Sequence, residues 1–405
     1  MNVLMISPGF PDEMPRFSSA LAEVGATVYG IGDGPAAGLP EEVRRKLAGY
    51  LQVRRLTDEH RVVPQVQEWL RGRTLDRVEC LWEPGMLLAA HLRQGLDVPG
   101  LTVEQTIPFR DKESMKAKLD AAGIRTPHHY RANTTTEVRE AAERVGYPLI
   151  IKPIAGAGSA DTWEVRDDDQ LEEALQRVEH VPEVSVEEFI EGEEYTWDTV
   201  SARGDVLFEN VAWYRPNPLI SRLTEWISPQ ALCLRDLSQP EIEVGCELGR
   251  EVLQALEWSG GFAHMEWFRT KSGEAVFGEI GGRSPGGRLV HAMNYSSNLD
   301  LFRGWAEAVV HNSLSQDTTK LYNSAVVFKR AQGDGHIKSY EGLDRLLAHH
   351  GEHICAVELQ PIGAPRRDWR QVVSGDGWIV VRHPDLATTM ELADHVGTEL
   401  RITAG

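Results

Sequence analysis

Two glutamates in the segment HMEWFRTKSGEAVFGEIGG are spaced so that a β-hairpin would bring them together. If the hairpin turns between Ser272 and Gly273, Glu266 lies directly opposite Glu279, with Cβ atoms about 5 Å apart on one face of the sheet. Two carboxylates in this position repel each other unless a cation lies between them, and oxygen ligands of this kind suit Mg²⁺. The hairpin therefore predicts a metal site, and the alternative is that one glutamate points into solvent.

The segment GGRSPGGR, residues 281–288, follows the second strand of this hairpin. Its glycines expose backbone N–H groups, and Arg283 and Arg288 add positive charge, so the segment could bind a phosphate or a carboxylate. His264 would face Gly281 on the same side of the hairpin as the two glutamates. The alternative is a surface loop whose arginines pair with acidic residues of the chain.

Lys152 ends the apolar strand PLIIK and precedes a loop of small residues. An ammonium group in such a strand is costly to bury unless it meets an anion, and the loop could fold over phosphates. The strand-like segment DTWEV follows, so the pattern differs from phosphate-binding loops that lead into a helix. A flexible hairpin loop with a solvent-directed lysine is the alternative. The candidate phosphate-binding residues of the loop are Gly156, Ala157, Gly158 and Ser159.

The segment VEEFIEGEEYTW places acidic residues around an apolar pair, Phe189 and Ile190. Backbone groups of such a hinge could bind the edge of an adenine, and a downstream glutamate could bind ribose hydroxyls. The alternative is a solvated acidic turn.

In their order along the chain, these motifs resemble the ATP-grasp superfamily of carboxylate–amine ligases, over roughly residues 105–310. By this resemblance, DKESMKAKLDAAGIRTP carries the first nucleotide-binding lysine, and Glu266 and Glu279 hold one or two Mg²⁺ ions, which Mn²⁺ can replace. Many members have an asparagine as a third metal ligand where this chain has Gly281, so the coordination of a second ion stays open. The implied ATP-binding residues are Lys112, Lys152, Gly156, Ala157, Gly158, Ser159, Glu187, Glu188, Phe189, Ile190 and Glu194.

The resemblance implies an enzyme that activates a small carboxylate as an acyl phosphate and joins it to an amine. The segments SAVVFKRAQGDGHIKSYEGLDRLL and GWIVVRHPDLATTMELADHV are similar to the C-terminal domain of L-amino acid ligases, which favours amino acids as substrates and a dipeptide as product. Three alternatives stay open: an ATP-grasp carboxylase, a ligase of nucleotide-pathway intermediates, and a nucleotide-binding module without catalysis. The implied catalytic residues are Lys152, Arg283 and Arg288, and the candidate substrate contacts are Trp213, Tyr214, Arg215, His264 and His291.

The elements that must position these residues indicate a multi-domain chain that combines α/β and α+β parts. Alternating strands and helices predict a Rossmann-like parallel sheet over residues 1–105. Residues 106–315 are expected to form the ATP-grasp domain, with a lid subdomain at about 125–190, and residues 316–405 a small C-terminal α/β domain. Residues 216–236 contain three prolines and are expected to be an irregular segment that acts as a lid.

Composition limits the partners. The chain has 405 residues and a net charge of −19, and a surface this acidic repels phosphate backbones and anionic lipid. The resemblance implies ATP, a carboxylate and an amine as ligands, and a homodimer is compatible with it. The acidic composition argues against nucleic acid and a membrane as partners. The cysteines are scattered, no apolar run reaches the ~18 residues of a membrane span, and the first residues carry no basic segment, so a cytoplasmic protein is expected.

Overall fold

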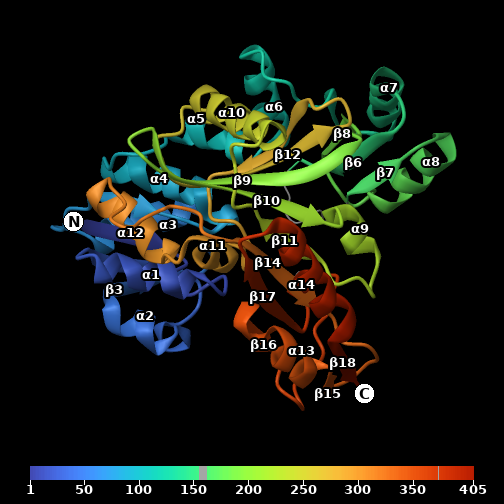
Figure 1. Ribbon diagram of the computed structural model, residues 1–405. Coiled ribbons are helices and arrows are strands. Elements are labelled where there is room, and N and C mark those ends of the chain that lie inside the picture. The colour runs from blue at the N-terminus through green and yellow to red at the C-terminus, as the bar shows by residue number, and fades with distance from the viewer. Residues whose placement is uncertain (155–161, 373) are drawn as a thin grey trace.

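The computed structural model describes residues 1–154, 162–372 and 374–405. The N-terminal part is a parallel sheet in the order β3-β2-β1-β4, covered by helices that connect its strands (Figure 1, blue). The elements are β1 (Asn2–Ile6), α1 (Met14–Glu23), β2 (Thr27–Gly32), η1 (Ala36–Gly38), α2 (Glu41–Lys46), β3 (Leu47–Gln52), α3 (Glu59–Trp69), β4 (Arg77–Glu79), η2 (Glu83–Gly85) and α4 (Met86–Leu96).

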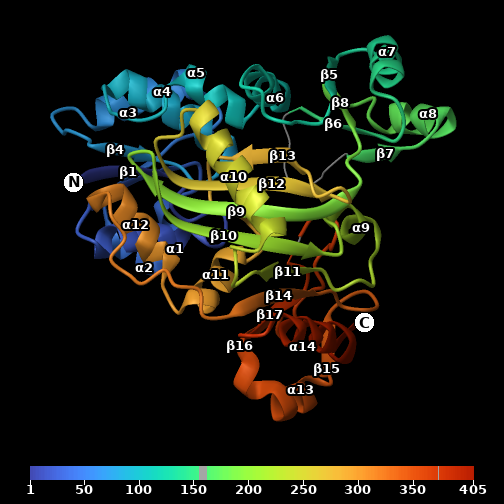
Figure 2. The same cartoon turned by 45° about the horizontal axis from the view of Figure 1, so that its top comes forward.

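An eight-stranded sheet forms the middle of the molecule, in the order β13-β12-β9-β10-β11-β14-β17-β16 (Figure 2). The C-terminal strands β14, β17 and β16 continue this sheet, so the segment after residue 316 extends the sheet of the preceding one. The domain boundaries near 105 and 315 stay predictions. The strands are β9 (Gly192–Ala202), β10 (Asp205–Arg215), β11 (Gln230–Cys233), β12 (Gly260–Thr270), β13 (Ala275–Gly281), β14 (Asn323–Lys329), β16 (Ile354–Leu359) and β17 (Gly377–His383).

Alternation along β12 separates the core of this sheet from its polar face. Ala263, Met265 and Trp267 belong to one hydrophobic core, whereas His264 and Glu266 have the opposite parity and point to the other face. Helix α10 (Pro240–Ala255) covers the core side, and its glycines allow close packing. A Cβ atom on Gly245 would lie 2.1 Å from the Trp267 ring, and one on Gly249 would lie 2.2 Å from the Trp197 ring.

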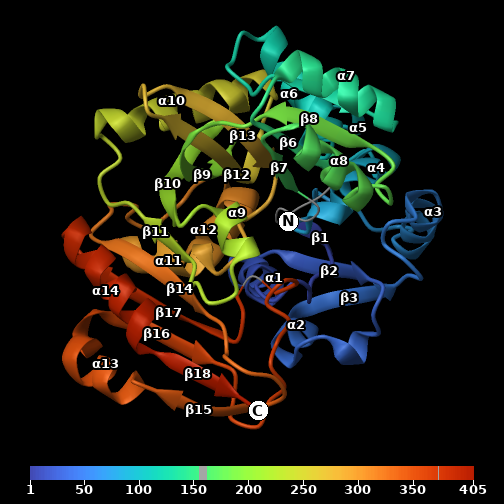
Figure 3. The same ribbon diagram turned by 90° about the vertical axis from the view of Figure 1, so that its right-hand side faces the viewer.

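A smaller antiparallel sheet, in the order β5-β8-β6-β7, projects from the body of the molecule together with its helices α7 and α8 (Figure 3). It has a hydrophobic core of its own. Thr134 and Asp167 cap the two helices with their side-chain oxygens, which fixes where the helices begin. We refer to this unit as the lid sheet. Its elements are β5 (His129–Ala132), α7 (Thr135–Val145), β6 (Leu149–Pro153), β7 (Trp163–Val165), α8 (Asp168–Arg177) and β8 (Val184–Glu188).

The segment 216–236 is more regular than the sequence suggests. It contains the short helix α9 (Pro218–Leu223) and the buried strand β11, which pairs with both β10 and β14 in the middle of the large sheet. The remaining elements are α5 (Val103–Thr106), η3 (Ile107–Phe109), α6 (Lys112–Ala121), α11 (Leu289–Ser297), α12 (Leu301–His311), β15 (Ile337–Glu341), α13 (Leu343–His350), η4 (Gly351–His353), α14 (Leu386–Glu399) and β18 (Arg401–Ala404). None of the helices in these described ranges combines the length and apolar character needed to cross a bilayer.

Candidate active site

A cavity of about 160 Å³ lies where the lid sheet meets the large sheet and α6. Most of the residues singled out in the sequence line it, although their chain positions run from 112 to 283. The predicted residues that line it are Lys112, Lys152, Glu187, Glu188, Phe189, Ile190, Glu194, His264, Glu266, Glu279, Gly281 and Arg283.

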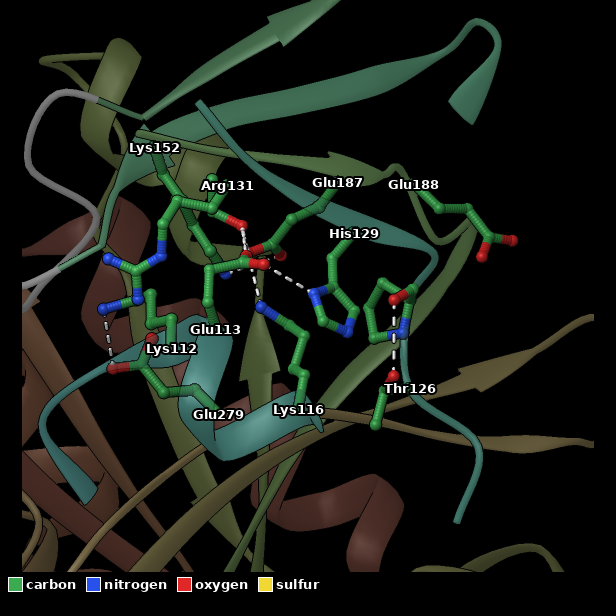
Figure 4. Close-up of polar contacts among 12 residues, drawn as sticks. Lys112, Glu113, Lys116, Thr126, His129, Arg131, Lys152, Glu187, Glu188 and Glu279 are labelled. Carbon is green, nitrogen blue, oxygen red and sulfur yellow. Dashed lines mark hydrogen bonds and ion pairs between the residues drawn. The ribbon is translucent and has the colours of Figure 1, made fainter. Parts of the chain in front are cut away.

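The lid side of the cavity is cationic and built around Glu187 (Figure 4). Lys152 Nζ lies 2.9 Å from Glu187 Oε2, and Lys116 Nζ, whose side chain is 1% exposed, pairs with the other oxygen. Burial alone would raise the pKa of Glu187, but the two lysines hold it well below its usual range. Burial alone would likewise lower the pKa of Lys152, but Glu187 and Glu279 raise it overall. Lys152 therefore stays charged although it ends a buried strand.

A chain of polar contacts continues from Glu187 and ties helix α6 to the lid sheet (Figure 4). Ser185 Oγ donates to Glu187 Oε1 over 2.7 Å and also contacts Glu113 on α6. Glu113 Oε2 lies 2.7 Å from His129 Nδ1, and the other ring nitrogen of His129 lies 3.0 Å from Asp120 Oδ2. Helix α6, which presents Lys112 at its first position, is thereby held against the strands that carry Lys152 and Glu187.

The opposite side of the cavity is rich in carboxylates. Glu266 lies opposite Glu279 in the β12–β13 ladder, as the hairpin predicts. The predicted turn centre is wrong by half a residue, because pairs near the turn, such as Trp267 with Phe277, are offset by one, and a bulge at Gly278 restores the register. A Cβ atom on Gly278 would lie 2.8 Å from the carbonyl oxygen of Glu266, so the bulge requires glycine.

Negative charge on this side exceeds what its neighbours neutralise. Burial and the nearby Glu266 raise the pKa of Glu194 well above its usual range, although Asn217 Nδ2 donates to Glu194 Oε2 over 2.6 Å. Burial would also raise the pKa of Glu266, but His264 holds it below its usual range. Glu279 Oε1 lies 3.1 Å from Lys112 Nζ, which connects the two sides of the cavity.

His264 is held by a fully buried carboxylate. Its Nδ1 lies 2.6 Å from Asp198 Oδ1, and Asp198 also accepts hydrogen bonds from Thr196 and Asn210. The other ring nitrogen lies 3.6 Å from Glu266 Oε1. Burial would lower the pKa of His264, but Asp198 raises it to about 9. The imidazolium therefore supplies positive charge beside Glu266.

Arg283 is fixed by a residue that the sequence reasoning missed. Glu83 Oε2 accepts from Arg283 Nε over 2.8 Å, and its other oxygen pairs with Arg110. Glu83 follows β4, at the carboxyl end of a parallel strand, which is where ligand-binding residues of such sheets gather. That position is the signal that could have identified it.

Other predicted residues lie outside the lining of this cavity. Arg288 Nη2 lies 3.2 Å from Asp12 Oδ2, and His291 Nε2 lies 3.3 Å from Glu13 Oε1, in a contact between α11 and the start of α1. The loop residues Gly156, Ala157, Gly158 and Ser159 lie outside the described part of the chain.

Trp213, Tyr214 and Arg215 line a neighbouring open hollow of about 510 Å³. This hollow shares Glu194 and Asn217 with the main cavity, and Tyr214 Oη donates to Glu266 Oε1 over 3.3 Å.

Comparison with known proteins places this cavity in a recognised fold. Residues 109–212 match the profile of the ATP-grasp domain. The chain is 26% identical over 284 residues to an L-arginine-specific L-amino acid ligase of Bacillus subtilis, with 68% of each chain covered. It is 28% identical over 209 residues to a D-alanine–D-alanine ligase of Nitrosospira multiformis, with 50% of this chain and 66% of the relative covered.

Solved structures agree over the whole length. An L-amino acid ligase from Bacillus licheniformis superimposes with a TM-score of 0.77 at 21% identity, over 99% of this chain and 98% of the other. N5-carboxyaminoimidazole ribonucleotide synthetase from Thermotoga maritima gives 0.73 at 17% identity, over 100% and 99%. The biotin carboxylase domain of Hydrogenobacter thermophilus 2-oxoglutarate carboxylase, a dimer in complex with MgADP and bicarbonate, gives 0.69 at 15% identity, over 99% and 91%. With its lysines and carboxylates gathered in one cavity, the chain contains an ATP-grasp domain and has the fold of the ATP-grasp ligases.

Proposed function

We propose that this protein is an ATP-dependent carboxylate–amine ligase. It transfers the γ-phosphoryl group of ATP to an amino acid or another small carboxylate. The amine of a second amino acid then attacks the acyl phosphate and releases phosphate, which leaves an amide or dipeptide. The observation that carries the proposal is the single cavity in which a cationic side, with Lys112 and Lys152, adjoins a carboxylate side, with Glu266 and Glu279.

Lys112 and Lys152 bind the phosphate chain in this proposal, and the hinge at residues 187–190 binds the adenine. Lys152 suits this role because Glu187 keeps its ammonium charged and fixes its position. Glu194 would bind ribose hydroxyls, since it lines the same cavity. Arg283, oriented by Glu83, would stabilise the negative charge of the acyl phosphate.

The carboxylate side fits Mg²⁺, and the same pair would accept Mn²⁺. Glu266 and Glu279 offer oxygen ligands from opposed strands, and Glu194, whose pKa is raised by burial and by the nearby Glu266, lies on the same side. In the described ranges no group of three or more His, Cys, Asp or Glu side chains is arranged to hold a metal. The pair would therefore leave the other positions of one or two ions to water and phosphate oxygens, as Mg²⁺ prefers. When bound, the ion would neutralise charge on the transferring phosphoryl group.

The hollow beside the main cavity is the proposed acceptor site. Trp213, Tyr214 and Arg215 would contact the amino acid that supplies the amine, because their hollow opens next to Glu194 and Asn217. Arg288 and His291 line neither hollow. Their own ion pairs do not bring them to a bound substrate, so the proposal gives them no substrate contact. A homodimer stays a prediction.

The test is a screen of amino-acid pairs for phosphate release from ATP, with mass spectrometry of the products. We expect ADP, phosphate and a dipeptide in equal amounts with at least one pair. Lys152→Met should abolish turnover, and Glu274→Gln, which changes an exposed glutamate at the hairpin turn, should leave it unchanged. ADP formation with bicarbonate but with no amine would favour a carboxylase. Nucleotide binding without ADP formation across the panel would favour a non-catalytic module.

A further inference from the structure

A second cavity, of about 270 Å³, lies behind the active site and shares no described lining residue with it. It runs along the edge strand β4 and helix α4 on one side. The other side is formed by the end of β9, the start of β12 and helix α12. Figure 1 shows α4, α12 and the blue N-terminal sheet together at this end of the molecule, away from the lid sheet. We refer to it as the β4 cavity.

Three buried hydrogen-bond donors that line the β4 cavity lack a partner in the described structure. They are the Ser201 hydroxyl and the indole N–H groups of Trp258 and Trp305, in side chains that are 1%, 9% and 0% exposed. A buried donor without a partner costs about 1–3 kcal/mol, so native proteins rarely retain several around one space. Three of them around one cavity point to a ligand that accepts hydrogen bonds.

The charges around the β4 cavity specify that ligand further. Arg77, Arg93 and Arg203 line it, against a single carboxylate, Glu79. The chain as a whole carries a net charge of −19, so an excess of arginine here is a local feature. Arg93 is anchored, because its Nη2 donates to the carbonyl of Val78 over 2.7 Å. The walls thus offer positive charge for an anion and one carboxylate, Glu79, for a cation.

The rest of the wall is apolar, with Leu81, Met86, Leu101, Phe262 and Val309. A free α-amino acid with an apolar side chain matches these walls, with one carboxylate, one ammonium and an apolar body.

We propose that the β4 cavity is a second ligand site that binds a free apolar α-amino acid. Its carboxylate accepts from the indole N–H groups and the Ser201 hydroxyl, its ammonium pairs with Glu79, and its side chain packs against the apolar wall. This site is distinct from the substrate positions of the proposed reaction and does not depend on that reaction for its existence.

The β4 cavity is also placed to act on the active site. Gly282 lines it, between Gly281 and Arg283, which line the active-site cavity. A Cβ atom on Gly282 would lie 2.8 Å from the Trp258 ring and 2.9 Å from the Met86 side chain. A ligand that contacts Trp258 therefore presses on the residue next to Arg283.

The test is calorimetric titration of the full-length protein, without ATP, with L-leucine as probe. Two analogues that lack one charged group, 4-methylpentanoate and 3-methylbutylamine, accompany it. We expect L-leucine to bind and each analogue to bind at least about tenfold more weakly, since each loses one charged contact. Ser201→Ala and Trp305→Phe should each weaken L-leucine binding about fivefold to tenfold, the effect of losing one hydrogen bond. The readout needs no turnover, so it is independent of the ligase proposal.

Trp378→Phe is the matched control, because Trp378 also has a buried indole N–H without a partner but lies outside this cavity. Its affinity for L-leucine should equal that of the wild type. If Trp305→Phe fails to fold, Arg203→Asn at the exposed rim replaces it, since asparagine tolerates the φ of 55° there. No binding of L-leucine would overturn the proposal. Binding of 4-methylpentanoate as tight as that of L-leucine would also overturn it. So would L-leucine binding that Glu194→Gln weakens and Ser201→Ala leaves unchanged.

Discussion

The lid side and the carboxylate side of the active-site cavity are both made of buried charged residues, but the sign of the excess charge differs between them. On the lid side, one carboxylate, Glu187, lies between Lys116 and Lys152, so positive charge is in excess. On the other side, burial and the nearby Glu266 raise the pKa of Glu194, and the carboxylates Glu194, Glu266 and Glu279 outnumber the cations, so negative charge is in excess. The contact between Lys112 and Glu279 joins the two sides.

This difference indicates what each side contributes. On the lid side each lysine already contacts Glu187, so we expect the removal of one partner to cost stability. The carboxylate side holds charge that a cation would neutralise, so we expect it to contribute to chemistry. A cavity with excess positive charge on one side and excess negative charge on the other suits a ligand that combines an anion with a cation. Nucleotide phosphates with a divalent ion are such a ligand.

Lys116→Met should have the largest effect on stability. It removes one of the two cations beside Glu187 and keeps the volume of the side chain, and breaking a buried pair costs about 3–5 kcal/mol. Because Lys152 stays beside Glu187, we expect the free energy of unfolding in urea to fall by about 3 kcal/mol. The control is Lys118→Met, whose exposed contact with Glu257 should contribute less than about 1 kcal/mol. An equal loss in both variants would contradict the special role of the buried pair.

On the carboxylate side, Glu279→Gln should have the largest effect on turnover. The loss of one electrostatic stabiliser of the transition state lowers kcat by about 100-fold or more, and we expect nucleotide affinity to change much less. Repulsion between the two hairpin glutamates alone predicts that the metal-free variant melts higher. Because Lys112 Nζ lies 3.1 Å from Glu279, the lost pair offsets this gain, and we expect little change in Tm. ADP formation, nucleotide affinity and melting are the measurements, and near-normal turnover at saturating Mg²⁺ would refute the metal assignment.

Part of this arrangement follows from the sequence. The pairing of Glu266 with Glu279 follows from the turn, and the apolar positions of β12 follow from strict alternation. Lys116 could also have been found, because it lies one helical turn after Lys112 and therefore on the same face of α6. The alternation of strands and helices in the N-terminal part predicts its parallel sheet, and the parallel pairing of β1, β2, β3 and β4 confirms it.

Other features are not encoded in any local pattern. Strand β11 has four residues, too few for a period, and its place between β10 and β14 depends on tertiary pairing. Helix α11 starts without a side-chain cap at Arg288, so no capping residue marks its beginning in the sequence. The contact between Asp198 and His264 joins residues 66 positions apart, and only the register of β9 with β12 brings them together.

Asp198→Asn tests whether His264 supplies positive charge to the carboxylate side. In the metal-free protein the pKa of His264 is raised from 6.5 to about 9, so the folded state binds the proton more tightly than the unfolded state. This stabilisation is fully present below pH 6.5 and is lost as the pH rises through about 9, an effect of roughly 3 kcal/mol. Unfolding free energies between pH 6 and 10 should fall in the wild type and stay flatter in the variant. Parallel curves would show that His264 is neutral in the fold.

Glu188→Gln should have the smallest effect, although Glu188 is the neighbour of Glu187 in β8. Successive residues of a strand point to opposite faces, so Glu188 pairs with Arg125 near solvent, with side chains that are 28% and 33% exposed. Exposed pairs contribute about 0–1 kcal/mol, so we expect unfolding to change by less than about 1 kcal/mol and nucleotide affinity to stay constant. Glu187→Gln leaves Lys116 and Lys152 without their shared carboxylate, and it should lower both stability and nucleotide affinity. Glu187 and Glu188 are neighbours in the sequence but lie on opposite faces of β8. Comparing the two variants therefore shows whether the burial of the glutamate, rather than its position in the chain, determines the effect. Equal effects on nucleotide affinity would mean that the hinge acts through its overall charge rather than through the lysine that Glu187 holds.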